Sequence, residues 1–429
     1  MNFILKDFPE IDERYYEGTH ASGLKIYVIP KNHGTAYAVF GTKFGSIDNK
    51  FKNARGEEVV LPDGIAHFLE HKLFENEDGT DTFSRYAKFG GSANAYTSSD
   101  ATVYLFSATG SISENLEILL DFVTHPYFTD ETVNKEMGII GEEIRMYDDN
   151  PDWRLYFNLM RALFKDNPVR IDTAGTEKTI AEITPEKLFE AYNSFYNLHN
   201  MALVVCGNIS PEQVSAAADK MLPSNEVEKV PVERIYPDEQ TAVAQKEIVE
   251  KMQVAMPMVN VGIKDTAGHL YGIDLAKMSA MYNIILEVIY GRSSRFYNEN
   301  YEKGLINRSF SGSEDIHERF AYCIVGGSTE KPDELAKAIM DEAAYFVENG
   351  IAEEDFERAK RKLYAGSIKV FNSTDDIANS FLGFKFSECD LFEYPRIMQS
   401  ITLEETEKLL KKAFVPERFA VSKILPLEE

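Results

Sequence analysis

The stretch DGIAHFLEHKLFE, Asp63–Glu75, places two histidines and a glutamate within five residues of an apolar segment. His67, Glu70 and His71 form the pattern H-x-x-E-H, and phenylalanine and leucine residues stand between and after them. The spacing of the apolar residues predicts a helix without a clean solvent-facing side, with Asp63 as its N-terminal cap. A buried helix that carries two histidines and a glutamate indicates a chemical purpose for these groups.

The spacing of the two histidines suits a metal ion. Residues four apart on a helix are neighbours on one face, with Cβ atoms about 5–6 Å apart. His67 and His71 can therefore present two imidazoles to one ion, while Glu70 lies beside that face without having to bind it. Zinc in hydrolases commonly takes three protein ligands and keeps the fourth position for water. The alternative, an amphipathic helix with surface histidines, is disfavoured by the interleaved apolar residues.

A second helix, expected over residues 129–149, offers candidates for the third ligand. Glu136 and Glu143 are seven residues apart and share one face of this helix, whereas Glu142 is turned about 100° away. The apolar residues expected around that face are Ile139, Ile140 and Ile144. A half-buried carboxylate needs a partner, and a metal ion supplies one. We therefore predict Glu143 as the third ligand and Glu136 as an acid that orients the site.

The composition restricts the class of protein. A length of 429 residues exceeds one ordinary core and predicts more than one domain. The formal net charge of −25 argues against binding to nucleic acid or to an anionic membrane surface, since both need clustered Lys and Arg. No apolar run is long enough to span a membrane, and the three cysteines are odd in number and far apart. These features favour a cytoplasmic protein.

The chain has the pattern of a duplication. Residues 88–123 and 303–347 both run from Lys and Gly through polar residues into an aromatic strand, a turn and an amphipathic helix. The helix expected over residues 274–290 of the second half has no histidine, so we expect only the first half to bind metal. The predicted domains are an N-terminal catalytic zinc domain over 1–222, a polar linker over 223–246 and a homologous C-terminal domain over 247–429.

Three segments together resemble a known family. GIAHFLEH, GGSANAYTS and EMGIIGEEI are similar to segments of the pitrilysin/insulinase family of zinc metallopeptidases, whose motif has the inverted order H-x-x-E-H. The resemblance covers essentially the whole chain and is strongest to the bacterial YmfH-type branch, and mitochondrial processing peptidase is a half-size relative. It implies an α+β fold of two homologous domains, the LuxS/mitochondrial-processing-peptidase-like metallohydrolase fold. Each domain would be a mixed sheet packed against helices.

The resemblance also implies roles for single residues in the first half. His67, His71 and Glu143 would bind one Zn²⁺ ion per chain. Glu70 would be the general base, and Glu136 would be a second catalytic acid, placed behind the ligands.

The segment SANAYTS would be the edge strand that binds the substrate, through Asn94, Ala95 and Tyr96. An extended peptide added to such an edge is held by main-chain hydrogen bonds, with little reading of its sequence. We therefore predict a zinc endopeptidase that cleaves short or unfolded peptides. Two alternatives stay open: a non-catalytic or partner-dependent subunit of a processing peptidase, and a zinc hydrolase of a non-peptide amide or ester.

The second half departs from the family pattern. Relatives commonly carry there an Arg and a downstream Tyr that contact the substrate carbonyl. In this sequence Tyr301 stands at the Arg position, Phe310 is the aromatic residue nearest to the Tyr position, and Arg308 follows Tyr301. We keep Tyr301 and Arg308 as candidate contacts. Because the family places four such domains around one chamber, the two-domain chain implies a homodimer or a heterodimer with another half-size member, and the departure favours a heterodimer.

Overall fold

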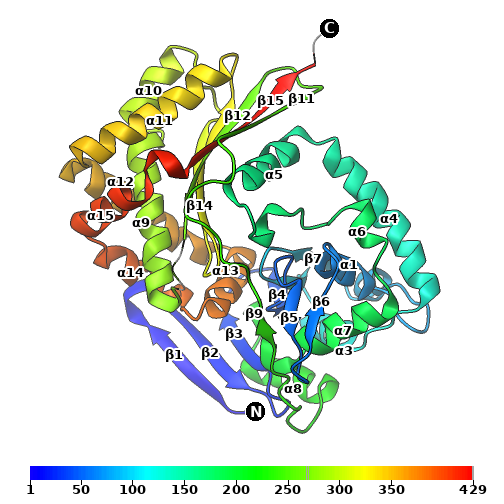
Figure 1. Cartoon of the computed structure of the whole chain (residues 1–429). Helices are drawn as coiled ribbons and strands as arrows, with labels where there is room; N and C mark the ends of the chain where they lie inside the picture. Colours follow the sequence, from blue (N-terminus) through cyan, green and yellow to red (C-terminus); the bar gives the residue numbers. More distant parts are fainter. Residues whose placement is uncertain (267, 269, 428–429) are drawn as a thin grey trace. The chain divides into compact units, whose positions relative to one another are not determined.

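The computed structural model describes residues 1–266, 268 and 270–427. This part of the chain forms two units, each with its own sheet. Unit 1 comprises Met1–Ile144, Asp172–Ile235 and Lys369–Phe386, and unit 2 comprises Arg145–Ile171, Tyr236–Ile368 and Ser387–Glu429. Each unit therefore contains a segment from the other half of the sequence, as the colours of Figure 1 show.

Unit 1 is built on a seven-stranded mixed sheet in which only β3 and β9 run parallel (Figure 1). In spatial order its strands are β1 (Phe3–Phe8), β2 (Glu13–Thr19), β3 (Lys25–Pro30), β9 (Met201–Gly207), β4 (Ala36–Thr42), β8 (Thr102–Ala108) and β7 (Gly91–Thr97). A small second sheet joins β10 (Glu233–Arg234), β5 (Lys50–Lys52) and β6 (Glu58–Val60). The strand β7 forms one edge of the large sheet.

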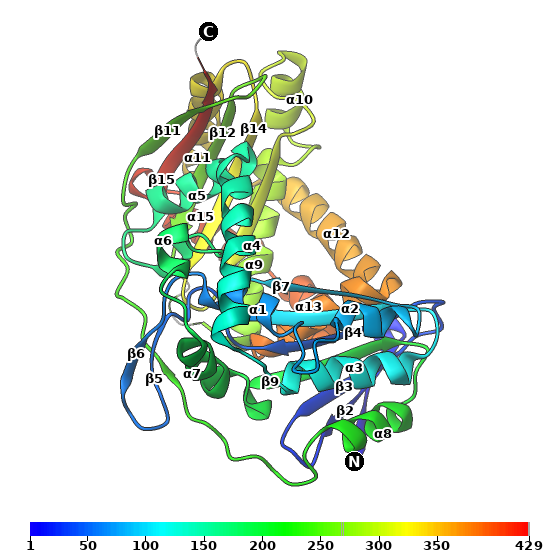
Figure 2. The same cartoon turned by 90° about the vertical axis from the view of Figure 1, so that its right-hand side faces the viewer.

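Helices cover both faces of this sheet. The helices that unit 1 contains wholly or in large part are α1 (Ile65–Lys72), α2 (Thr82–Ala87), α3 (Ile112–Thr124), α4 (Asp130–Asp148), α6 (Glu177–Ile180), α7 (Pro185–Phe195), α8 (Pro211–Met221) and α13 (Thr374–Phe386). On one face the ring of Tyr104 packs against Phe122 of α3, with the centroids 5.7 Å apart. On the other face Leu382 of α13 lies over Gly41 of β4. Figure 2 shows α1 next to β7, which it also contacts.

Unit 2 has a five-stranded sheet covered by helices. Its strands, in spatial order, are β11 (Glu247–Met252), β15 (Phe419–Pro426), β12 (Met258–Asp265), β14 (Ala321–Ser328) and β13 (Ser311–Ile316). Its helices are α5 (Pro151–Leu163), α9 (Gly272–Tyr290), α10 (Arg295–Glu302), α11 (Pro332–Asn349), nearly all of α12 (Glu353–Lys369), α14 (Tyr394–Ser400) and α15 (Leu403–Ala413). No helix of the described residues is both long and apolar enough to cross a membrane.

The two sheets share one topology, which confirms the predicted fold of two homologous α+β domains. The order β3-β9-β4-β8-β7 of unit 1 matches the order β11-β15-β12-β14-β13 of unit 2. In both sheets the first pair is parallel and the following three pairs are antiparallel. The compared segments 88–123 and 303–347 coincide with equivalent hairpins, β7–β8 and β13–β14, each followed by a helix.

The exchanged helices sit over equivalent glycines. A Cβ atom on Gly41 of β4 would lie 2.7 Å from Leu382 of α13, and one on Gly262 of β12 would lie 2.9 Å from Leu163 of α5. Gly41 pairs with Ala202, and Gly262 pairs with Ala420. Each sheet therefore has a pair of small residues beneath a helix from the other half of the sequence. The predicted domain boundaries, 1–222 and 247–429, describe the sequence repeat and stay a prediction. The units of the structure follow other boundaries, because unit 1 includes Lys369–Phe386 and unit 2 includes Arg145–Ile171.

Candidate metal centre

Helix α1 holds the sequence motif in a buried position. Of its eight residues, only His71 is not fully buried, and Phe68 and Leu69 are completely inaccessible. The prediction that Asp63 caps this helix is wrong. The N-cap is Gly64, whose φ of 90° favours glycine and whose missing side chain makes room for the Ala174 carbonyl. The Asp63 carboxylate instead accepts a hydrogen bond from Asn49 Nδ2 at 2.8 Å.

Two helices bring the three predicted ligands together. One ligand atom from each of His67, His71 and Glu143 can be chosen so that all lie within 4.8 Å of one another. Glu143 Oε1 lies 3.8 Å from His67 Nε2, and Glu143 Oε2 lies 3.5 Å from His71 Nε2. The two imidazoles therefore present the same type of nitrogen to one carboxylate of α4.

The neighbouring face of α4 differs in part from the prediction. Glu142 is exposed and outside the cluster, as its angular position on the helix predicts, and Ile140 and Ile144 are buried. Ile139, which we expected around the same face, is 49% exposed. Ile139 and Ile140 lie on opposite sides of the line through Glu136 and Glu143, and only the side of Ile140 and Ile144 is buried.

Glu136 orients His71. The His71 Nδ1 atom lies 3.0 Å from Glu136 Oε1, and a proton shared there leaves Nε2 free to bind a metal. Burial would raise the pKa of the Glu136 carboxyl, but the hydrogen bond and charge of His71, with nearby Lys72 and Lys135, lower this pKa below its usual value. A carboxylate in this contact fixes the orientation of the His71 imidazole ring.

The environment of His67 favours a neutral imidazole. Burial, together with the charge of His71, lowers the pKa of His67 to about 4. Its Nδ1 atom is buried and has no hydrogen-bond partner among the described residues. A neutral imidazole is the form that binds a metal ion. Two imidazoles and one carboxylate are also a donor set that fits zinc.

Glu70 lies on the same helix and is held from the edge strand. Its side chain is buried, and Thr97 Oγ1 of β7 donates a hydrogen bond to Glu70 Oε2 at 2.6 Å. Burial raises the pKa of Glu70, partly offset by this hydrogen bond and by the charge of His71. Sequence reasoning missed Thr97. The available signal was the two-residue alternation of β7, which places Thr97 on the same face as Ala95.

The predicted substrate residues Asn94, Ala95 and Tyr96 lie on the edge strand β7. The Ala95 N–H donates to the Asn94 side chain at 2.9 Å. Tyr96 points to the opposite face of the sheet from Thr97, where its hydroxyl donates to Asn379 of α13 at 3.1 Å. Ala95 therefore shares the face of Glu70, whereas the ring of Tyr96 lies away from it.

Comparison with known proteins decides the family. A family model described as insulinase, peptidase family M16, matches residues 58–177, and one described as peptidase M16 inactive domain matches residues 182–363. The uncharacterized zinc protease YmfH of Bacillus subtilis (strain 168) is 41% identical over 425 residues, which are 98% of this chain and 98% of that protein. The chain belongs to peptidase family M16. The resemblance predicted from the sequence is confirmed.

Other M16 relatives agree with this assignment. The uncharacterized zinc protease YmxG of Bacillus subtilis is 26% identical, covering 85% of this chain and 88% of that protein. The crystal structure of an M16-like peptidase from Alicyclobacillus acidocaldarius has a TM-score of 0.93 at 33% identity, covering 100% of this chain and 99% of that one. A protease from Helicobacter pylori has a TM-score of 0.81 at 20% identity, covering 96% and 100%, and shares the fold.

The remaining predicted residues, Tyr301 and Arg308, lie in unit 2. Tyr301 lies in the last turn of α10, is 44% exposed and stacks on Tyr297, and Arg308 is exposed in the segment before β13. Phe310 is buried in the core of unit 2, next to Phe296. Phe310 therefore offers neither a hydroxyl group nor an accessible ring to a substrate. The roles of Tyr301 and Arg308 stay a prediction.

Proposed function

We propose that this M16 chain is a zinc-dependent endopeptidase that hydrolyses peptide bonds in short or unfolded peptides. The observation that carries the proposal is the convergence of His67, His71 and Glu143 within 4.8 Å, with Glu70 on the same helix as the two histidines. Two imidazoles and one carboxylate are a common donor set of zinc hydrolases. The names of the relatives, which are zinc proteases, agree with it.

Each side chain of the centre has a defined task in this proposal. A zinc ion, when bound, polarises the scissile carbonyl and lowers the pKa of the attacking water. Glu70 accepts a proton from that water and returns it to the leaving amine. Thr97 holds one carboxylate oxygen and leaves the other for the water.

The substrate is proposed to bind as an additional strand on β7. This strand lies at the edge of the seven-stranded sheet, so a peptide can pair with its outer side. Ala95 and Thr97 face the side of Glu70, which brings a backbone carbonyl of such a peptide towards the metal centre. Such an edge favours a peptide over a non-peptide amide or ester as the substrate.

The direct test replaces Glu70 with glutamine. We expect Glu70→Gln to keep one zinc per chain, measured by atomic emission, and to lose about 10²–10⁴-fold in peptide turnover. The control is Glu142→Gln, which removes one charge outside the cluster and is expected to keep both zinc and turnover. Normal turnover by Glu70→Gln contradicts its role as the base. A wild-type chain that binds no zinc supports the alternative of a non-catalytic subunit.

We propose further that the active form is a dimer with another half-size M16 chain. The support is Phe310, which is buried and lacks the hydroxyl expected near the substrate carbonyl, so that a partner can supply this contact. This favours a heterodimer over a homodimer. Native mass measurement alongside peptide turnover tests the proposal, since an active homodimer contradicts the heterodimer.

The proposed location is the cytoplasm. All three cysteines, Cys206, Cys323 and Cys389, are buried and free of disulfides. Three buried cysteines that form no disulfide suit a reducing compartment. Fractionation of cells that produce a tagged full-length chain tests this location, and recovery from an oxidising compartment contradicts it.

A further inference from the structure

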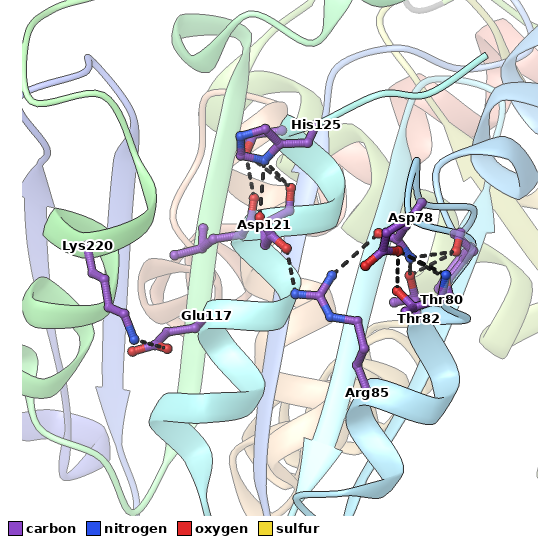
Figure 3. Close-up of polar contacts among 12 residues, drawn as sticks. Asp78, Thr80, Thr82, Arg85, Glu117, Asp121, His125 and Lys220 are labelled. Atoms are coloured by element: carbon purple, nitrogen blue, oxygen red, sulfur yellow. Dashed lines mark hydrogen bonds and ion pairs between the residues drawn. The ribbon is translucent and has the colours of Figure 1, made fainter. Parts of the chain in front are cut away.

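The strand on which a peptide is proposed to lie, β7, is held at its start by two helices. At Gly91 the side chain of Asn115 of α3 leaves no room for a Cβ atom. Helix α2 also contacts β7, and Figure 3 shows Arg85 of α2 pointing to Asp121 of α3, with which it forms an ion pair. The start of the strand is therefore supported by helices that are joined to each other.

The end of β7 lies beside the metal centre and is held on both faces of the sheet. On the α1 face, Thr97 donates to Glu70 at 2.6 Å. On the α13 face, the Tyr96 hydroxyl donates to Asn379 Oδ1 of α13 at 3.1 Å. Because β7 is an edge strand, its strand partner β8 holds it from one side, and these two contacts act across the sheet.

Small residues bring α13 within reach of the edge strand. Tyr96 pairs with Val103 of β8, and Val103 pairs with Gly41 of β4. Directly opposite residues of neighbouring strands point to the same face, so Tyr96 and Gly41 both face α13. Leu382 lies over Gly41, and Asn379 is three residues before Leu382, on the same side of the helix. The close approach at Gly41 thus lets Asn379 meet Tyr96.

The helix that carries Asn379 is anchored to the sheet. The ring of Phe381 is completely inaccessible and meets the rings of Tyr15 and Tyr27 edge-on, with centroids 4.9 and 5.1 Å away. Lys385 Nζ lies between 5.0 and 5.4 Å from the centroids of the same three rings and donates to the Tyr15 hydroxyl at 3.0 Å. A cation over aromatic faces adds to the apolar packing, so α13 is a fixed support.

The Asn379 amide is oriented to accept the bond from Tyr96. Its Nδ2 atom donates to the Asp375 carbonyl at 3.0 Å and to the Tyr37 hydroxyl at 3.4 Å. These two contacts use the donors of the amide and leave Oδ1 as an acceptor. A tyrosine hydroxyl carries its proton at neutral pH, so Tyr96 is the donor that this oxygen needs.

We propose that Asn379 is a positioning residue for the peptide-binding strand, an inference that rests on the proposed binding of the peptide to β7. Through the Tyr96 hydroxyl it holds the end of β7 beside Glu70 from the α13 face. The segment Lys369–Phe386 comes from the second half of the sequence and thereby takes part in substrate binding by unit 1. Without this bond a peptide has to order the strand before it pairs with it, which weakens binding.

The test uses the zinc-loaded full chain and a quenched fluorogenic peptide of extended, alanine-rich sequence. Asn379→Ala and Tyr96→Phe remove the same hydrogen bond from its two ends. We expect KM to rise about three- to tenfold in each, the effect of one lost hydrogen bond, at unchanged kcat and zinc content. The double variant is expected to have the KM of either single variant. Asn379→Asp keeps the acceptor oxygen and is expected to keep the wild-type KM.

Asn349→Ala is the matched control. Asn349 of α11 donates to the Tyr345 carbonyl at 2.8 Å, four residues earlier, as Asn379 does to its own helix. The control is expected to keep the wild-type KM. Amide hydrogen exchange of residues 91–97 gives a second readout, because it reports the order of β7 without any peptide. We expect faster exchange in Asn379→Ala and Tyr96→Phe and unchanged exchange in the control.

The exchange measurement separates this inference from the proposed function. Faster exchange of β7 in both variants, without any cleavage by the wild type, supports the positioning role and contradicts the peptidase. Cleavage with unchanged KM in both variants overturns the positioning role and leaves the peptidase intact. The role is also wrong if the double variant shows an additive rise of KM, if zinc content falls, or if Asn349→Ala behaves in the same way.

Discussion

Replacing Glu143 with glutamine isolates the role of one carboxylate in metal binding. Glu143→Gln keeps the side-chain volume but exchanges an anionic oxygen donor for a neutral amide. The adjacent residue provides a matched control, because Glu142 is exposed and outside the ligand cluster. Glu142→Gln and Glu143→Gln remove the same charge from the same turn of α4, so a difference between them reports on ligation alone.

The expected magnitude follows from the size of the ligand set. Glu143 supplies one of three converging ligand atoms. Four-ligand zinc sites in small domains bind with roughly 10–16 kcal/mol, or about 3 kcal/mol per ligand. Since each 1.4 kcal/mol corresponds to tenfold, the loss of Glu143 weakens zinc binding by about 100-fold. At a zinc concentration of 100 times the wild-type Kd, the stabilisation by zinc falls from about 2.7 to about 0.4 kcal/mol.

Two measurements check this prediction. Competition with a chromophoric chelator gives the zinc affinity of the wild type and both variants. Urea unfolding with and without zinc gives the stabilisation of unit 1 by the ion, with the apo proteins as the reference for effects of the substitutions on folding. Equal zinc affinities for Glu143→Gln and Glu142→Gln refute the assignment of Glu143 as a ligand.

Three further substitutions test the parts around the ligands. Glu136→Gln weakens the hydrogen bond that orients His71 and is expected to lower zinc affinity by about 10–100-fold, measured with the same chelator. An unchanged zinc affinity shows that the contact is not needed. Thr97→Val removes the hydrogen bond to Glu70 and is expected to lower kcat about tenfold at unchanged zinc content. Thr97→Ser keeps the hydroxyl group and is expected to keep kcat. An equal loss of kcat in both variants points to packing instead. Gly41→Val forces a side chain against Leu382 of α13 and is expected to lower the free energy of unfolding in urea by about 1–3 kcal/mol. Gly34→Ala, at a position that faces open space, is expected to change it little. Equal losses in both variants argue against tight packing of α13.

The clustering of His67, His71 and Glu143 was predictable from the sequence because its geometry depends on the spacing within two helices. Four-residue spacing places His67 and His71 on one face, and seven-residue spacing separates the face of Glu143 from that of Glu142. The hairpin over β7 and β8 was also predictable, since β8 is rich in β-branched and aromatic residues and a short polar turn precedes it.

Contacts between segments distant in sequence were not predictable in this way. The exchange of α5 and α13 depends on the small residues at Gly41 and Gly262, which a single sequence marks only as glycines within strands. The capping error at Asp63 has the same origin, because the conformation of Gly64 is set by its approach to Ala174, about a hundred residues away. Local signals located the elements but not the partners that fix their ends.

Among the described residues, unit 2 has no cluster like that of His67, His71 and Glu143. The contact between helix and strand that corresponds to α1 and β7 explains this difference. In unit 2 this contact joins α9 and β13, and Ser279 and Asn283 stand four residues apart on the helix, as His67 and His71 do on α1. Ser279 Oγ and Asn283 Nδ2 each donate to Glu314 of β13 at 2.6 Å. Burial raises the pKa of Glu314, partly offset by these donors. The half-buried Glu314 carboxylate already accepts hydrogen bonds from two neutral donors, and neither donor offers an imidazole. The contact between α9 and β13 therefore keeps the helix–strand arrangement of α1 and β7 with neutral donors in place of the two histidines.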